Sequence, residues 1–183
     1  MGNDQCSMTN DQTRSLTLEE AVPMANDLLD ELKEFCEQIE IAGSIRRRRS
    51  VVNDIDIVAL PKKDRLTALR EYVLKQGSVT SEGLDVLIVK LANDVQLDLW
   101  LARPTSRDLF AETPTNYGSL MVCRTGSEEH NIWLCNEAKK LGRQWNPYRG
   151  VFEGEKLIAS ATEREIFAAL EVPYINPHRR ERP

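Results

Sequence analysis

Two aspartates in one alternating segment constrain the fold of this chain more than any other feature. Residues 54–60 read Asp-Ile-Asp-Ile-Val-Ala-Leu, an alternation that is typical of a β-strand. Because successive side chains of a strand point to opposite faces, Asp54 and Asp56 point to the same face. Two carboxylates so close together repel each other unless a cation lies between them. The segment therefore predicts a strand that carries a candidate cation site.

A second motif, Gly43-Ser44-Ile45-Arg46-Arg47, precedes this strand. Gly43 allows the chain to turn sharply out of a short apolar strand at 39–43. We expect Ser44 to cap a short helix that runs through the arginines, so that its free N–H groups and its dipole face an anion. Arg47, in the first turn, can add a charge-assisted fork to the same phosphate groups. The motif therefore predicts an anion site next to the cation site.

A third acid lies in a later strand. Asp98 stands between Leu97 and Leu99 in an apolar segment expected to form a strand over 95–101. A third carboxylate there can complete an oxygen site for Mg²⁺. Taken singly, each feature has an ordinary explanation, since a D-x-D strand and an arginine run usually face solvent and a lone Asp is often an edge residue. The conjunction of all three in this order favours a functional site.

The other elements follow from periodicity and turn residues. Thr17 and Glu20 form a capping-box pattern before a helix whose apolar spacing continues to Ile39, with Pro23 expected to kink or delay its start. We expect a helix at 64–76 and a strand at 86–91, joined to the strand at 95–101 by a hairpin at Asn93-Asp94. Beyond Pro104 the pattern predicts helices within 113–142 interrupted at 125–127, a small hairpin within 144–158, a capped helix at 162–170 and an irregular basic tail.

At this point the chain resembles a known group. Gly43–Asp56 is similar to the signature of the polymerase beta-type nucleotidyltransferases. The resemblance continues through Thr125-Gly126-Ser127-x-x-His130-Asn131, a motif of the family X DNA polymerases, and through the segment 146–152. It extends to the C-terminal helix and tail, so it covers residues 17–182. It implies a short form without the N-terminal lyase and helix-hairpin-helix domains of longer relatives.

The resemblance implies an α+β fold. A tail at 1–15, expected to be disordered, would precede a nucleotidyltransferase palm at 16–111, a small mixed sheet with helices. A small α/β C-terminal subdomain at 112–183 would bind the nucleotide and the base pair. Function would then be nucleotidyl transfer from a dNTP, with an rNTP as a further candidate, to a DNA 3′-hydroxyl, as in a minimal DNA repair polymerase.

Residue roles come from the same resemblance. Asp54, Asp56 and Asp98 would be catalytic and would hold two Mg²⁺ ions, for which Mn²⁺ can substitute. The nucleotide would contact residues of the two glycine motifs and their neighbours, namely Gly43, Ser44, Arg47, Asn53, Cys123, Gly126, Ser127 and Asn131. The T-G-S motif also implies a cis peptide bond between Gly126 and Ser127. DNA, as a primer–template or a gapped duplex, and dNTP would be the partners.

Several positions depart from the family pattern. Asn53 stands where Gly is common, Gln96 and Trp100 stand where arginines flank the third Asp, and Cys123-Arg124 replaces Tyr-Phe before the T-G-S motif. Cys135 stands where an arginine steadies the template base. The metal and triphosphate motifs are intact, so these departures bear on sugar selection and template fidelity.

Charge and composition set limits on the partners. The net charge is −5, but residues 1–40 carry ten acids and two bases, which leaves the rest of the chain at +3 and allows a modest basic face. We find neither a signal-peptide pattern nor an apolar run near the roughly 20 residues that cross a bilayer. Four cysteines without a C-x-x-C pair argue against structural zinc. We therefore expect an intracellular, cytoplasmic monomer that does not bind membranes.

Two alternatives remain open at this stage. A nucleotidyltransferase that modifies a small molecule or a protein would share the G-S-x-R and D-x-D motifs, but it should lack T-G-S-x-x-H-N and the matching tail. A non-catalytic nucleic-acid or protein-binding module would be favoured by the loss of one carboxylate, and all three are present.

Overall fold

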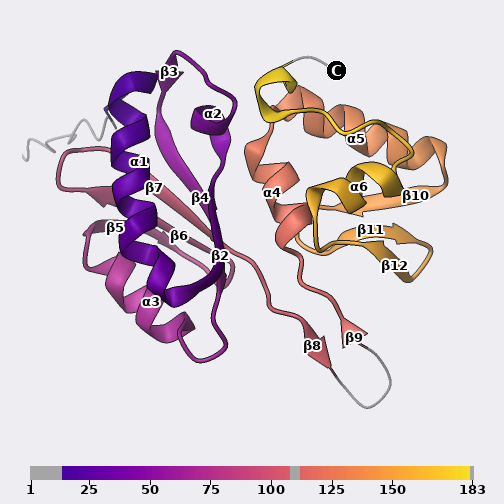
Figure 1. Cartoon of the computed structure of the whole chain (residues 1–183), viewed down its shortest axis with the longest axis horizontal. Helices are drawn as coiled ribbons and strands as arrows, with labels where there is room; N and C mark the ends of the chain where they lie inside the picture. Colours follow the sequence, from indigo (N-terminus) through magenta and orange to yellow (C-terminus); the bar gives the residue numbers. More distant parts are fainter. Residues whose placement is uncertain (1–13, 108–111, 182–183) are drawn as a thin grey trace, which may run out of the picture.

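The computed structural model describes residues 14–107 and 112–181. Two halves lie side by side, an N-terminal one built on a five-stranded sheet and a C-terminal one built mainly of helices (Figure 1). The fold is therefore α+β, as expected. The division into a palm at 16–111 and a subdomain at 112–183 stays a prediction. Most of the expected 1–15 tail and residue 111 of the boundary lie outside the described residues.

The first helix, α1 (Leu18–Leu32), begins where its capping box predicts. Thr17 accepts a hydrogen bond from the N–H of Glu20, whose carboxylate accepts one from the N–H of Thr17. The expected delay at Pro23 is wrong, since the helix runs through that residue. The expected continuation towards Ile39 is also wrong, because a 3-10 turn, η1 (Lys33–Phe35), leads into strand β2 (Cys36–Ile41). The apolar residues keep a helical spacing beyond Leu32 because α1 and β2 both bury residues in the same core.

The central sheet is mixed. Its order is β2-β4-β7-β6-β5, and its remaining members are β4 (Asp54–Pro61), β7 (Gln96–Leu101), β6 (Val86–Leu91) and β5 (Gly77–Glu82). Strands β4 and β7 are parallel, and all the other pairs in this sheet are antiparallel. The hairpin at Asn93-Asp94 is confirmed, with Lys90 opposite Gln96 and a left-handed Asp94 at φ 64°. Strand β5 was not anticipated, since its side chains are all exposed and give no apolar signal.

The two central strands divide their side chains between the faces of the sheet. Ile55, Ile57, Leu97 and Leu99 are fully buried in a core that also contains residues of α1 and of α3 (Leu66–Leu74). The other face carries the aspartates at the start of the strands. Farther along, it packs against α4 (Tyr117–Thr125). The catalytic candidates therefore lie at the edge of the contact between the two halves.

Short elements connect and complete the two halves. Helix α2 (Gly43–Arg46) follows β2, and a two-stranded ladder joins β1 (Leu16–Thr17) to β3 (Val51–Val52). Another pair, β8 (Ser106–Arg107) and β9 (Glu112–Thr113), lies in the connection between the halves and projects away from both of them (Figure 1).

The C-terminal half confirms most of the expected elements. Helices α4 and α5 (Glu128–Lys140) are separated by residues 126–127, within the interruption expected at 125–127. Helix α6 (Glu163–Ala169) begins after the capping box at Thr162. The small hairpin expected within 144–158 is instead a three-stranded antiparallel sheet of β10 (Arg143–Asn146), β11 (Gly150–Glu153) and β12 (Lys156–Ala159). The tail after Pro173 is irregular apart from the 3-10 turn η2 (Pro177–Arg179).

Replacing the cap of α6 is expected to weaken this half. Thr162→Ala removes the hydroxyl that accepts from the Glu165 N–H, so the free energy of unfolding should fall by about 1 kcal/mol in urea titration. Thr67→Ala is the matched control, because Thr67 is exposed inside α3, where Ala has the higher helix propensity. A Thr162→Ala variant as stable as Thr67→Ala would contradict a role for this cap.

Candidate active site

The three predicted carboxylates share one face of the sheet. In the parallel pairing of β4 with β7, Asp56 is the register partner of Asp98, and Asp54 is the partner of Gln96. Since side chains alternate along each strand, Asp54, Asp56 and Asp98 all project opposite to the buried isoleucines and leucines. Asp98 is only 8% exposed, although it lies near the start of its strand. The convergence expected from the sequence is therefore present at the level of the sheet.

Asp56 is held at both carboxylate oxygens. Its Oδ1 accepts a hydrogen bond of 3.1 Å from Trp100 Nε1. Its Oδ2 lies against Gly43, where an added Cβ would overlap this oxygen. Gly43 also has a φ of +58°, so both its backbone conformation and its missing side chain are required. Gly43 therefore both adopts the backbone conformation of the turn and leaves space for the Asp56 carboxylate.

The pKa of each of the three carboxylates is raised above its ordinary value. Burial and, next, the charges of Asp54 and Asp98 raise the pKa of Asp56 to about 7. Burial also raises the pKa of Asp54 and of Asp98, for which the hydrogen bond of 2.7 Å from Gln96 Nε2 to Asp98 Oδ1 is an opposing effect. Three acids that repel each other on a half-buried face form an all-oxygen donor set, which suits Mg²⁺ or Mn²⁺.

These acids do not yet form a coordination shell. Within residues 14–107 and 112–181, no group of three His, Cys, Asp or Glu side chains is arranged to hold a metal ion. Asp98 and Asp56 instead each accept a hydrogen bond, from Gln96 and from Trp100. Side-chain rotation at Asp54, Asp56 and Asp98 would be needed for them to share a cation.

Arg124 supplies positive charge close to the aspartates. Its guanidinium carbon lies 3.2 Å from the centre of the Trp100 ring, and the guanidinium also hydrogen-bonds the hydroxyl of Tyr148. Its charge partly counters the raised pKa of Asp56 and of Asp98. Sequence reasoning identified Trp100 and Arg124 only as departures from a pattern. The position of Trp100 two residues after Asp98 on one strand was the signal that places the two on the same face.

Ser44 differs from its expected role. The predicted cap is wrong, because Ala42 is the N-cap of α2, and the Ser44 hydroxyl makes no capping hydrogen bond. The Ser44 Oγ atom is buried and has no partner among the described residues. The predicted helix through the arginines is also shorter than expected, since α2 ends at Arg46 and Arg47 is its C-cap. A buried hydroxyl beside the free N–H groups of α2 remains suited to a phosphate oxygen.

The four arginines divide into different environments. Arg46 makes a bidentate ion pair with Glu163 at 2.8 Å for both bonds and so ties α2 to α6. Arg47 donates through Nε to Glu181 Oε1 at 2.6 Å and through Nη1 to the carbonyl of Thr125. Arg48 and Arg49 are exposed.

Other nucleotide-site candidates line a groove between the halves. This groove of about 510 Å³ is lined by residues of α4, α5 and the segment after α2, including Arg47, Cys123, Arg124, Gly126, Ser127 and Asn131. Asn131 Nδ2 donates to the carbonyl of Cys123 at 2.8 Å, which fixes the amide against α4. The expected cis peptide bond between Gly126 and Ser127 is confirmed.

Two of the candidates point elsewhere. The Ser127 hydroxyl accepts from the His130 N–H and donates to the Arg180 carbonyl at 2.8 Å, so it is committed within the fold. The Asn53 side chain accepts a bond of 2.9 Å from the Ser15 hydroxyl. The Ser127 N–H also donates to the Arg180 carbonyl, so both hydrogen-bond donors of Ser127 are used within the fold.

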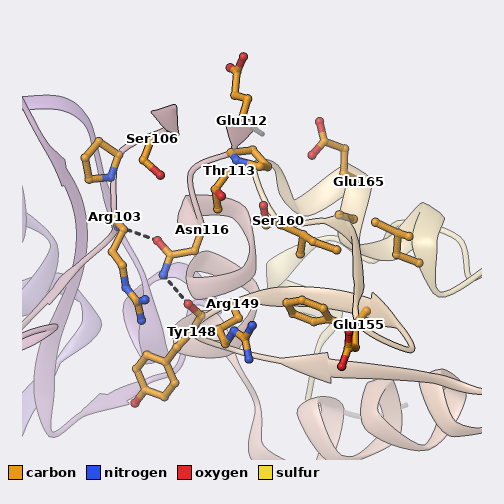
Figure 2. Close-up of a pocket in the computed structure, with 16 residues that line it drawn as sticks. Arg103, Ser106, Glu112, Thr113, Asn116, Tyr148, Arg149, Glu155, Ser160 and Glu165 are labelled. Atoms are coloured by element: carbon orange, nitrogen blue, oxygen red, sulfur yellow. Dashed lines mark hydrogen bonds between the residues drawn. The ribbon is translucent and has the colours of Figure 1, made fainter. Parts of the chain in front are cut away.

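A second hollow lies apart from the aspartates. It measures about 550 Å³ and lies among the β8–β9 pair, β11 and β12 (Figure 2). Asn116 closes one side by accepting from the Arg103 N–H at 2.7 Å and donating to the Tyr148 carbonyl at 2.8 Å. Asp54, Asp56 and Asp98 do not line this hollow, so we assign the chemistry to the sheet edge.

Comparisons with known proteins agree with this geometry. A family model described as DNA polymerase beta thumb matches residues 120–181. The DNA polymerase/3′-5′ exonuclease PolX of Bacillus subtilis (strain 168) is 29% identical over 165 residues, which are 88% of this chain and 28% of that protein. The repair DNA polymerase X of African swine fever virus (isolate Pig/Kenya/KEN-50/1950) is 24% identical over 151 residues, 81% of this chain and 84% of the viral protein. The chain is thus similar to family X DNA polymerases along most of its length.

Solved structures of similar proteins share this fold. Two crystal structures of Leishmania infantum polymerase beta, a ternary P/T complex and a ternary gap complex, match it with TM-scores of 0.72 and 0.73. Both are 19% identical in sequence and cover 93% of this chain, which in turn covers 78% and 72% of theirs. The chain spans little more than a quarter of the length of the Bacillus subtilis relative.

The lengths and compositions of the helices can be compared with those of membrane-spanning segments. None of those in the two described stretches of chain is both long enough and apolar enough to span a bilayer.

Proposed function

We propose that this chain transfers a nucleotide from a dNTP to the 3′-hydroxyl of a DNA primer–template or gapped duplex. The observation that carries the proposal is the register of Asp56 with Asp98, with Asp54 on the same face, beside the Gly43–Arg47 motif. Similarity to two proteins that are named DNA polymerases favours DNA as the substrate. The repair polymerase X and polymerase beta relatives make short gaps the preferred duplex to test.

Asp54, Asp56 and Asp98 would hold the metal ions in this proposal. Their oxygen donors, their burial and the raised pKa of Asp56 fit a pair of Mg²⁺ ions, with Mn²⁺ as a substitute. When bound, such ions supply charge stabilisation for an in-line displacement at phosphorus.

The protein's own groups would bind and orient the reactants. Ser44 and Arg47 would hold the triphosphate, and Cys123, Gly126 and Asn131 would flank sugar and base. The primer 3′-oxygen then bonds to the α-phosphorus, and the bond from that phosphorus to the bridging oxygen of pyrophosphate breaks. The proton of the 3′-hydroxyl passes to Asp98 Oδ2, since Oδ1 already accepts from Gln96. Burial, which raises the pKa of Asp98, makes this carboxylate a better base.

Primer extension tests the proposal. A 5′-labelled primer on a template or flanking a short gap, with Mg²⁺ and the four dNTPs, should lengthen in a template-dependent manner. Single-turnover rates would separate the chemical step from product release. Extension that is absent with every DNA, together with nucleotide transfer to a small molecule or protein acceptor, would contradict the proposal.

The sugar pocket should discriminate weakly between dNTP and rNTP. Cys123 lines the groove where the family resemblance implies a tyrosine, and a thiol fills far less of the space beside a 2′-hydroxyl. We expect the ratio of kcat/KM for dNTP over rNTP to stay below about a hundred, since a missing steric contact is worth roughly 1–3 kcal/mol.

A reciprocal substitution checks the sugar assignment. Cys123→Tyr should raise the dNTP/rNTP ratio about tenfold or more, mainly through the rNTP. Cys36→Ala serves as the control, because Cys36 is buried in the distant core of the sheet. A wild-type ratio above several thousand, or no change with Cys123→Tyr, would rule out the assigned position of Cys123.

A further inference from the structure

The C-terminal segment is anchored at Arg180. This side chain is fully buried, with Nε donating to the Ile175 carbonyl at 2.9 Å and Nη1 to Glu163 Oε1 at 2.8 Å. The carbonyl of Arg180 accepts from both the N–H and the hydroxyl of Ser127. Because residue 180 is held by its side chain and by its backbone, the position of the next residue, Glu181, is defined relative to Ser127.

Glu181 places its carboxylate between two arginines of the motif that follows β2. Its Oε1 lies 2.6 Å from Arg47 Nε, and its Oε2 lies 3.4 Å from Arg49 Nη1. The side chain of Arg47 is only 16% exposed, whereas those of Glu181 and Arg49 are 33% and 54% exposed. A charge-assisted bond to a half-buried guanidinium is stronger than an exposed surface pair. Arg47 is therefore engaged by an anion that the chain itself provides.

The same arginine borders the proposed triphosphate site. Arg47 lines the groove with Gly126, and its Nη1 lies 3.0 Å from the position of a Cβ built on that glycine. The buried Ser44 hydroxyl three residues earlier has no partner among the described residues. Carboxylate and phosphate oxygens seek the same guanidinium fork. A phosphate that approaches Arg47 therefore meets both an occupied donor and a like charge.

We propose that Glu181 is a resident anion of the polyphosphate site and sets its affinity by competing with incoming phosphates for Arg47. The proposal rests on the proposed function for the identity of the ligand. When phosphate takes Arg47, Glu181 keeps Arg49 as a partner, so its carboxylate is not left uncompensated. The apparent affinity is the intrinsic affinity multiplied by the fraction of molecules in which Arg47 is not engaged by Glu181.

Calorimetric titration with inorganic tripolyphosphate tests the competition without DNA and without added metal. In the full chain, Glu181→Gln removes the charge but keeps the shape, and we expect it to lower the dissociation constant about tenfold. Glu155→Gln is the matched control, since it removes an equal charge from an exposed position of the same half, and it should change binding less than about twofold. Unchanged or weaker binding by Glu181→Gln would overturn the proposal and would identify Glu181 as a residue that orients Arg47.

A double variant tests whether the effect passes through Arg47. Adding Glu181→Gln to Arg47→Ala should give no gain in tripolyphosphate affinity, whereas an undiminished tenfold gain would contradict the proposed competition. No binding by any form, with all of them folded by circular dichroism, would also overturn it. Failure of primer extension with the gain in affinity intact would refute only the proposed function. Normal extension without that gain would refute only the role of Glu181.

Discussion

Asp56→Ala is expected to abolish primer extension, lowering the single-turnover rate by at least roughly a thousandfold while the protein stays folded. Asp56 is the central member of the carboxylate group, since it pairs in register with Asp98 and follows Asp54 by two residues. Its loss removes a metal-ligand candidate and relieves repulsion, so the fold should not suffer. Single-turnover extension and thermal unfolding, measured on the same preparation, check both halves of the expectation.

A matched acid provides the control for this variant. Asp64→Ala removes an exposed carboxylate just before α3, and its rate should equal that of the wild type. If Asp56→Ala retained a rate near that of Asp64→Ala, Asp56 would have no part in catalysis.

The pH dependence of stability should also change in Asp56→Ala. In the metal-free native state the pKa of Asp56 is about 7, above its ordinary value of 3.8, so the folded protein binds this proton more tightly than the unfolded chain does. The stability that depends on this group is therefore fully present below about pH 4, is lost as the pH rises from about 4 to about 7, and stays constant above about pH 7. The variant should lose this decline, and added Mg²⁺ should reduce it in the wild type. Urea titrations across pH 4–8 measure both changes.

Arg47→Ala is expected to lower kcat/KM for dNTP about a hundredfold, with most of the loss in KM. A charge-assisted hydrogen bond to a phosphate is worth roughly 1.5–3 kcal/mol, which sets this scale. Arg49→Ala should have a much smaller effect on nucleotide use, because Arg49 is largely exposed, and should instead weaken DNA binding and flatten its salt dependence. Steady-state kinetics and DNA titration at several salt concentrations separate the two roles.

Arg47→Lys distinguishes charge from shape at this position. It keeps the positive charge but loses the fork that bonds Glu181 and the carbonyl of Thr125, so it should recover only part of the lost activity. Equal losses of nucleotide affinity in Arg47→Ala and Arg49→Ala would contradict the division of roles.

Local patterns made much of the fold predictable. The alternation at 54–60, the hairpin at Asn93-Asp94 and the capping boxes at Thr17 and Thr162 each specify a structure within a few residues, and each was confirmed. Element ends were less predictable where burial overrode local signals. The apolar spacing up to Ile39 suits a helix, yet residues 36–41 form a strand because pairing with β4 satisfies their backbone groups.

The candidate site was predictable in its strands but not in its long-range partners. Strand alternation placed Asp54 and Asp56 together, whereas the contact of Arg124 with Trp100 joins α4 to β7 and has no local signature. The pairing of Arg47 with Glu181 spans 134 residues, and such ion pairs depend on how the two halves pack. The prediction of Ser44 as the cap failed for a local reason, since α2 begins two residues earlier than the motif suggested, with Ala42 as its N-cap.

Template-directed extension of a labelled primer by the wild type and by Asp56→Ala tests the central claim most directly. With Mg²⁺ and a single dNTP at a time, the wild type should add the nucleotide that matches the template base. Under the same conditions Asp56→Ala should add none, although its circular dichroism spectrum is unchanged. Equal extension by the two proteins would contradict the catalytic assignment of Asp56, and no extension by either would contradict DNA-directed nucleotidyl transfer itself.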